Sequence, residues 1–134
     1  MIRTVNITFS SLQKDLSDTP DISEYTGEYT LQNGKRYLRY EKDGIKSFLK
    51  ITDDSLLVIN SGALSSRIEY IPGRTTTGTY QTPEGVLDAS IDTQRLNVIE
   101  GGAGCVLRII LSYRLSISGK HVSNYDIEIL CKKT

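Results

Sequence analysis

The residues best suited to catalysis are few: one histidine, His121, and two cysteines, Cys105 and Cys131. A single histidine excludes a metal site built from several imidazoles, and it leaves Ser-His-Asp or Cys-His catalysis dependent on one side chain beside a predicted turn. The cysteines alternate with apolar neighbours, as inert buried thiols do, and are too far apart for a thiolate metal site. A disulfide between them is the less favoured alternative. We therefore expect no catalytic residue, no metal and no cofactor.

Two motifs resemble ion-binding loops but lack essential parts. Asp15, Asp18 and Asp21 are regularly spaced, yet the glycine turn and the closing glutamate of a calcium loop are missing, so capping and solubility explain them better. Glu100 to Gly104 reads EGGAG, but it precedes a predicted strand, whereas a phosphate-binding loop opens a helix. We interpret this run as a wide turn or bulge.

Basic residues gather on one predicted hairpin together with two aromatic residues. They are Arg36, Arg39, Lys42, Lys46 and Lys50, with Tyr37 and Phe48. Such a set could face an acidic or nucleic-acid partner, but Glu41 and Asp43 dilute its charge. The whole chain has 16 basic and 16 acidic residues, so no net field draws it to nucleic acid or to an anionic membrane. We expect a solvated edge face, with no nucleic-acid or membrane partner.

Tyrosine dominates the aromatic residues, with eight tyrosines, two phenylalanines and no tryptophan. The apolar faces of the predicted strands carry seven of them: Tyr25, Tyr29, Tyr40, Tyr70, Tyr80, Tyr113 and Tyr125. These rings have hydroxyl groups that need partners, which a dry core rarely uses in such number. They indicate either a partly polar cavity for a small molecule or hydroxyl groups that reach water at the barrel ends.

The elements that must position these side chains are short strands, because apolar and polar residues alternate with a period of two almost throughout. Asn33-Gly34 and Asp43-Gly44 are strong two-residue hairpin signals. We leave residues 14–22 as a polar connector and place a turn at Thr93-Gln94. The predicted strands are Arg3–Ser11, Tyr25–Leu31, Lys35–Lys42, Ile45–Ile51, Leu56–Asn60, Arg67–Ile71, Thr75–Thr82, Val86–Asp92, Leu96–Glu100, Cys105–Ile117 and Val122–Cys131.

So many short strands with short connections predict an all-β fold, an antiparallel closed β-barrel that leaves no edge exposed. The length of 134 residues suits a single domain spanning 1–134. The first ten residues lack the pattern of a secretory signal, and no segment is long and apolar enough to span a bilayer. We expect a cytoplasmic protein.

Several segments together resemble the YwiB-like family of uncharacterised bacterial proteins. They are YLRYEKDG at Tyr37–Gly44, INSGALSSR at Ile59–Arg67, TGTYQTPEG at Thr77–Gly85, EGGAG at Glu100–Gly104 and YRLSISGKHVSNYDIEI at Tyr113–Ile129. The element Tyr80-x-Thr82-Pro83-x-Gly85 is the most specific. The resemblance implies a calycin-like, lipocalin-type barrel without an established activity. A retinoid or fatty-acid ligand is not carried over, because the chain lacks the tryptophan of the secreted lipocalin signature.

The sequence favours a non-enzymatic protein that binds a small amphipathic or anionic ligand at one barrel mouth. The resemblance implies Tyr40, Glu41, Arg67, Tyr80 and Thr82 as candidate ligand-binding residues, and Tyr113 joins them because it would line the mouth beside Tyr40 and Tyr80. Arg67 would supply charge, although it is out of phase with its apolar neighbours and points inward only if a bulge intervenes. The alternatives are an interaction module with a filled interior and a protein partner, or an enzyme using Glu41 or Asp88 beside an inward tyrosine. A monomer and a homodimer both fit the sequence.

Overall fold

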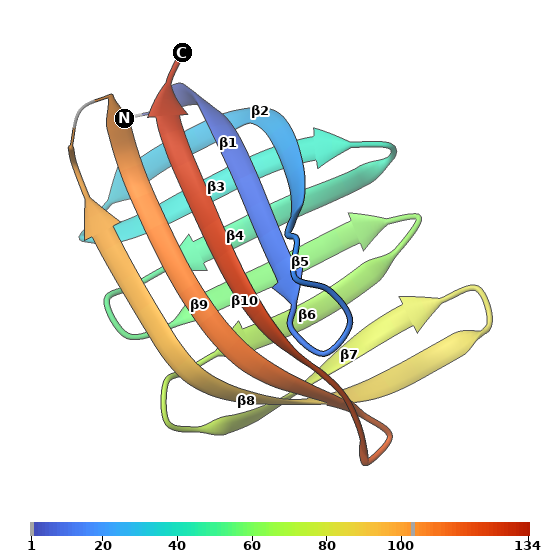
Figure 1. Ribbon diagram of the computed structural model, residues 1–134. Coiled ribbons are helices and arrows are strands. Elements are labelled where there is room, and N and C mark those ends of the chain that lie inside the picture. The colour runs from blue at the N-terminus through green and yellow to red at the C-terminus, as the bar shows by residue number, and fades with distance from the viewer. Residues whose placement is uncertain (1, 103) are drawn as a thin grey trace.

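The computed structural model describes residues 2–102 and 104–134, which form ten antiparallel strands and no helix. The strands close into one barrel in the order β1-β10-β9-β8-β7-β6-β5-β4-β3-β2 (Figure 1). Their bounds are β1 Ile2–Gln13, β2 Asp21–Gln32, β3 Lys35–Lys42, β4 Ile45–Ile51, β5 Leu56–Gly62, β6 Ser65–Tyr70, β7 Thr75–Thr82, β8 Gly85–Glu100, β9 Cys105–Ile117 and β10 Lys120–Lys133. The predicted closed antiparallel β-barrel is confirmed. In this part of the chain no helix has the length and apolar character needed to cross a membrane.

Tight turns join the strands where the sequence carries its hairpin signals. Asn33 and Gly34 both have positive φ, at 53° and 74°, and Asp43 and Gly44 repeat the pattern at 54° and 77°. Positive φ at both central residues defines the turn whose twist matches paired strands, and asparagine, aspartate and glycine adopt it at low cost. Each hairpin therefore fixes the register of the strands that it joins.

The turn predicted at Thr93-Gln94 is wrong, because β8 continues through it as one strand. The ladder between β8 and β9 shifts register between Thr93 and Arg95, so the chain forms a β-bulge there. The backbone of Thr93 is also paired with the β6–β7 turn, since Gly73 N donates to its carbonyl at 2.9 Å and its own N–H donates to Arg74 O at 3.2 Å. The bulge bends β8 around the barrel without ending it.

The predicted connector at residues 14–22 is shorter than expected. β1 extends to Gln13 and β2 begins at Asp21, and the added residues pair with neighbouring strands: Gln13 lies opposite Tyr125 in β10, and Asp21 lies opposite Ser11 in β1. These polar residues lack a strong alternation signal, but their backbone groups complete the ladder. The loop that remains spans residues 14–20.

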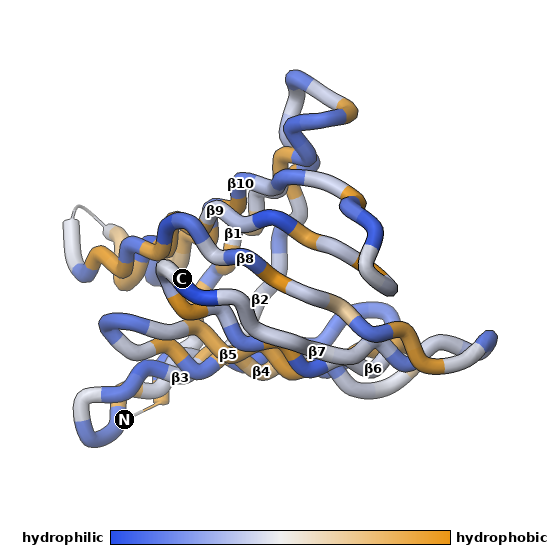
Figure 2. The backbone as a smooth tube through the Cα atoms, turned by 90° about the horizontal axis from the view of Figure 1, so that it is seen from below, coloured by the Kyte–Doolittle hydropathy of each residue, from blue (hydrophilic) through white to orange (hydrophobic). Residues whose placement is uncertain are grey.

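One part of the interior, the aliphatic region, is dry and tightly packed. Its members are each at most 1% exposed, except Ile129 at 2%: Val5, Ile7, Leu38, Ile51, Leu107, Ile109, Ile129 and Cys131. Figure 2 shows the source of this packing, as hydrophobic and hydrophilic positions succeed one another along the strands. The alternation sends one face of each strand into the shared core.

Arg36 is the one charged side chain that the described barrel buries, at 8% exposure. It alternates with Leu38 and Tyr40 on β3 and therefore points inward, so the expectation that it belongs to a solvated basic face is wrong. Its guanidinium pairs with Glu100 at the end of β8 and with Asp53 at 3.4 Å in the β4–β5 turn. The ion pairs supply the partners that a buried charge requires.

The two barrel ends differ in their connections. One end carries the turns at 33–34, 52–55 and 71–74 and the ion pairs of Arg36. The other end, on the right of Figure 1, carries the 14–20 connector and the turns at 43–44, 63–64, 83–84 and 118–119. In the same view β8, β9, β10 and β1 cross steeply in front of β3 to β7, so two groups of strands face each other across the interior.

Candidate functional site

Seven tyrosines share the inner face of the barrel, as the alternation predicts. Tyr29 and Tyr70 are buried within the core, and the remaining five pack against it from the same side: Tyr25, Tyr40, Tyr80, Tyr113 and Tyr125. Tyr37 lies on the outer face, where its ring stacks on Phe48 at 5.7 Å between centroids. The division of the tyrosines between the two faces is confirmed.

The inward rings form two contacting groups. Tyr113 lies between Tyr70 and Tyr125, with ring centroids 4.9 Å and 5.2 Å away. Tyr25 and Tyr40 stack at 4.6 Å. Offset or tilted rings at these separations attract each other through their quadrupoles and hold fixed orientations. We call these five residues, Tyr25, Tyr40, Tyr70, Tyr113 and Tyr125, the tyrosine region.

The buried phenol groups of Tyr40, Tyr70 and Tyr113 are neutral at ordinary pH. Burial raises the pKa of Tyr40, of Tyr70 and of Tyr113 above the usual value of 10, and for Tyr70 a neighbouring tyrosine adds to the effect. Desolvation penalises the phenolate because a buried negative charge loses its hydration. The rings therefore act as hydrogen-bonding walls of an uncharged space.

An interior cavity of about 200 Å³ lies between the tyrosine region and the aliphatic region. Uncharged side chains line it: Phe9, Ser11, Tyr40, Leu49, Leu56, Val58, Asn60, Tyr70, Leu111, Tyr113, Ile127 and Ile129. Polar and apolar groups share the wall almost equally: three phenol groups, the Ser11 hydroxyl and the Asn60 amide lie among seven apolar side chains. This composition is typical of small-molecule sites.

A second space of about 290 Å³, which we call the mouth recess, lies beside the β3–β4 turn. Tyr25, Lys42 and Ser47 line it, and Tyr40 and Asn60 line both the recess and the interior cavity. The two spaces are therefore neighbours across these two side chains. Tyr40 and Asn60 thus lie between the recess at the barrel end and the cavity in the core.

At this boundary, side-chain hydrogen bonds link three neighbouring strands on the inner face of the barrel. Ser47 Oγ donates to Asn60 Oδ1 at 2.6 Å, and Asn60 Nδ2 donates to Ser66 Oγ at 3.0 Å. The three residues are opposite one another on β4, β5 and β6, so the ladder itself brings them together. The bonds hold the Asn60 amide in one orientation, with one N–H and one oxygen lone pair still free to bind a ligand.

The structure brings two of the predicted site residues together and keeps two near them. Tyr40 and Tyr113 line the same cavity. Tyr80 also packs against the core from the inner face but does not line the cavity. Thr82 is occupied by its own turn, because its hydroxyl donates to Gly85 O at 3.0 Å and accepts from Glu84 N at 3.3 Å.

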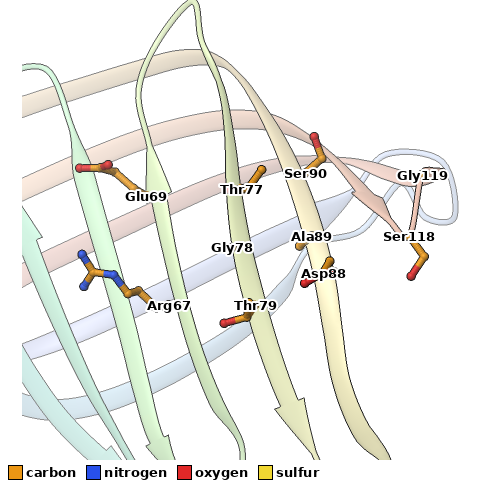
Figure 3. A pocket seen from close by; sticks show the side chains of 10 residues that line it. All are labelled: Arg67, Glu69, Thr77, Gly78, Thr79, Asp88, Ala89, Ser90, Ser118 and Gly119. Atoms are coloured by element: carbon orange, nitrogen blue, oxygen red, sulfur yellow. The ribbon is translucent and has the colours of Figure 1, made fainter.

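The other two predicted residues lie on the outer face, and each lines a different depression. Arg67 pairs with Ile59 and Thr79 in an unbroken register, so no bulge turns it inward. It lines an outer recess of about 620 Å³, where Figure 3 shows Arg67 and Glu69 extending from β6 away from β7. The expectation that Arg67 supplies charge beside Tyr40, Tyr80 and Tyr113 is therefore wrong.

Glu41 lies opposite Lys46 and lines an outer groove of about 600 Å³ with Arg39 and Phe48. Asp88 is likewise exposed and lines the same outer recess as Arg67. Neither carboxylate is beside an inward tyrosine. Acid-base chemistry at the mouth would require a carboxylate beside an inward tyrosine, and neither Glu41 nor Asp88 meets that requirement.

Sequence reasoning missed the polar residues at the cavity boundary. Ser47 alternates with Leu49, and Asn60 alternates with Val58, so the period of two already places both on the inner face. Lys42 is exposed, as expected of the basic hairpin, but it alternates with Tyr40, and its ammonium lies over the Tyr25 ring at 5.1 Å from the centroid. The alternation could have identified all three residues.

At the same barrel end, a series of hydrogen bonds and polar contacts connects Asp15 with His121. Arg114 Nε donates to His121 Nδ1 at 3.0 Å, His121 Nε2 lies 3.1 Å from Asp15 Oδ2, and Asn124 N donates to Asp15 Oδ1 at 3.0 Å. These bonds fix the 14–20 connector to β9 and β10. No sequence signal joins Asp15 to His121, because the two residues are 106 positions apart.

The two cysteines are free thiols. Cys131 is fully buried, and desolvation raises the pKa of its thiol to about 12. Such a thiol is protonated and unreactive at neutral pH. Among residues 2–102 and 104–134, no three His, Cys, Asp or Glu side chains cluster in a way that could hold a metal ion.

Comparison with known proteins gives the family and the fold. The model of the Domain of unknown function (DUF1934) family matches residues 7–129, which is most of the chain, so this protein belongs to that family. A crystal structure of ywiB protein from Bacillus subtilis superposes with a TM-score of 0.80 at 22% sequence identity, over 99% of this chain and 93% of that one. No curated protein matches the sequence. The resemblance to the YwiB-like family is confirmed, and it extends to the barrel fold.

Proposed function

We propose that this protein is a non-enzymatic binding protein that holds a small molecule in the interior cavity and admits it through the mouth recess. The observation that carries the proposal is that the two spaces adjoin each other and share Tyr40 and Asn60 as lining residues. An apolar pocket with a few convergent polar groups is the usual form of a ligand site. The ring contacts of Tyr113 with its neighbours hold one wall of this pocket in place.

The size of the cavity supports a ligand of modest dimensions. An apolar protein cavity of roughly 150 Å³ is large enough to bind benzene. The interior cavity of about 200 Å³ therefore suits one ring or a group of similar bulk, and the mouth recess of about 290 Å³ suits the remainder of the molecule. A long lipid chain would not fit.

A thermal-shift screen with a metabolite library at saturating concentration tests this proposal. A ligand present at about 100 times its dissociation constant stabilises the folded state by roughly 2.7 kcal/mol, which raises the melting temperature by several degrees. Compounds that raise it should lose their effect on the variant Val58→Phe, because the new ring occupies the cavity. If no compound in a broad library stabilises the protein, the proposal is wrong.

A neighbouring residue provides the matched control. Ile59 follows Val58 on β5 but faces the outer groove, so Ile59→Phe adds the same kind of ring outside the barrel. This variant should bind ligands as the wild type does. Loss of binding in both variants would indicate damage to the sheet instead of a filled cavity, and circular dichroism would show it.

One observation favours the alternative of an interaction module. The recess end displays exposed apolar side chains in the 14–20 connector and at the ends of β2, β8 and β10: Leu16, Ile22, Val86, Leu87 and Val122. Apolar groups gathered at one end of a molecule often mark a contact with a protein partner. Capture of a specific partner that Leu16→Ser abolishes and Val58→Phe leaves intact would favour this alternative.

A further inference from the structure

We infer that the ligand is a single-ring aromatic carboxylate, with its ring in the interior cavity and its carboxylate in the mouth recess beside Lys42. The inference rests on the proposed function and names the class of ligand for that same site. It depends on three features: an uncharged interior, an amide at the boundary of the two spaces, and a cation at the mouth.

The interior cavity admits an uncharged ring and excludes a charge. Every residue that lines it is apolar or neutral, and the pKa shifts of its phenols keep them protonated. Moving an ion into such a space costs far more than moving a ring, because the ion loses its hydration without gaining a countercharge. The faces and edges of Tyr40, Tyr70 and Tyr113 offer the tilted and stacked contacts that an aromatic ring prefers over an aliphatic group.

Asn60 marks the point where a polar group of the ligand would begin. Its amide is held by Ser47 and Ser66 and retains one N–H donor, and the residue lines both spaces. A carboxylate accepts hydrogen bonds but donates none. A carboxylate at the boundary can therefore accept from Asn60 while the ring stays in the cavity.

Lys42 supplies the cation. Its ammonium lies over the Tyr25 ring at the recess, and within residues 2–102 and 104–134 no carboxylate is at ion-pair distance from it. Glu41, its neighbour, faces the outer groove. Asp43 also lines the recess, as an exposed turn residue, and it would weaken the attraction for an anion without removing it. The free charge of Lys42 thus favours an anionic group at the mouth.

Four probes that differ in one feature test the inference by isothermal titration calorimetry at low salt. They are phenylacetate, 2-phenylethanol, phenethylamine and acetate. Phenylacetate should bind most tightly, 2-phenylethanol about tenfold more weakly and phenethylamine more weakly still, because a hydrogen-bonded charge adds about 1.5 kcal/mol. Acetate, which has no ring, should not bind. Added NaCl should reduce the advantage of phenylacetate.

Three variants identify the cation. Lys42→Gln should weaken phenylacetate binding about tenfold, to the level of 2-phenylethanol, and leave 2-phenylethanol unchanged. Lys46→Gln is the matched control, because Lys46 is exposed on the same hairpin but lines the outer groove, and it should leave phenylacetate binding unchanged. Asp43→Asn removes the opposing charge and should tighten phenylacetate binding, and asparagine tolerates the positive φ of this position, as Asn33 does in the preceding hairpin.

The outcomes separate the ligand class from the proposed function. Equal affinity for the three ring probes, or wild-type phenylacetate binding by Lys42→Gln, overturns the carboxylate at Lys42 and leaves a binding cavity in place. If no ring probe binds but other library compounds do, the ligand class is wrong and the proposed function stands. If nothing binds in the probe set or the library, both are overturned.

Discussion

The aliphatic region and the tyrosine region lie in the same barrel and are built from the same alternation, yet they are packed differently. Leu38, Ile51 and Leu107 are fully buried and line no cavity. Tyr40 and Tyr113 lie beside a cavity of about 200 Å³ and remain partly accessible. The first set packs closely against other aliphatic side chains, whereas the rings of the second set face aliphatic side chains, Ile129 among them, across open space.

The aliphatic region and the tyrosine region therefore have different roles in the barrel. The aliphatic region holds the strands together through apolar burial, which is the main favourable term in folding. The tyrosine region contributes less dense packing but presents aromatic faces, hydroxyl groups and the Asn60 amide to a shared space. A binding cavity can persist in a small barrel because the other region supplies the stability. The following predictions test that division, from the largest expected effect to the smallest.

Two leucines on one face of β9 offer the sharpest comparison. Leu107 lies in the aliphatic region, and Leu111, four residues further on, lines the cavity. Leu107→Ala should reduce the free energy of unfolding by about 2–5 kcal/mol, and Leu111→Ala by roughly half as much, because Leu111 already has open space on one side and loses fewer contacts. Urea unfolding measures both. Equal losses would show that the two regions are packed alike.

The ion pairs of Arg36 lie at the barrel end opposite the mouth recess. Glu100→Gln removes the principal charged partner of a buried guanidinium and should cost about 1–2 kcal/mol, less than in a fully buried pair because Glu100 is half exposed to solvent. Arg36→Met removes the charge itself and should cost less than Glu100→Gln, since no unpaired charge stays buried. Urea is the appropriate denaturant, because guanidinium chloride is a salt and would screen the ion pairs that the experiment compares. A larger loss in Arg36→Met would assign the guanidinium a packing role instead.

The tyrosines make the barrel sensitive to alkali. Burial raises the folded-state pKa of Tyr70 and Tyr113 above the unfolded value of 10, so the unfolded chain releases these protons first. Their contribution to stability is complete below pH 10 and is lost as the pH rises toward the folded-state pKa, by about 1.4 kcal/mol per pH unit for each group. Urea unfolding from pH 9 to pH 11.5 should show this decline, and Tyr113→Phe should make it shallower. An unchanged slope in that variant would contradict burial of the phenol.

The 14–20 connector should lose a small contribution to stability at low pH, whereas the tyrosines lose their contribution at high pH. The hydrogen bond from Asn124 N, followed by the contact with His121, holds the pKa of Asp15 below its usual value of 3.8. The stabilisation is therefore complete above the unfolded-state pKa and disappears as the pH falls through the folded-state pKa. The melting temperature of Asp15→Asn should be lower than that of the wild type at pH 6, and the two should converge near pH 2. Asp18→Asn, on the same connector, should follow the wild-type curve throughout.

Local rules in the sequence predicted much of the candidate site. A period of two assigns each strand residue to one face, and this rule alone places Tyr40, Tyr113 and Arg36 inside and Arg67 outside. The expectations about Arg36 and Arg67 are wrong because they rely on the charge of each side chain instead of its position in the two-residue alternation. Ser47 and Asn60 follow the same rule, but the sequence analysis did not select them as site residues because their side chains are polar.

Other features could not be predicted, for physical reasons. A β-bulge and a turn both reverse the alternation, so the phase change after Thr93 does not show whether the strand ends or continues. The hydrogen bonds of β1 with β2 and β10 extend that strand through residues without an apolar pattern. The pairing of Asp15 with His121 depends on which turns meet at one barrel end.

The sequence by itself determined most of the strands, the two-residue hairpin turns and the face on which each tyrosine lies, because alternation and turn chemistry act between residues close along the chain. The tertiary structure decided which inward side chains meet across the barrel, that Tyr40 and Asn60 separate an inner cavity from a recess, and that Lys42 borders that recess. Those relations depend on strand order, tilt and closure, which bring together residues that no local rule connects.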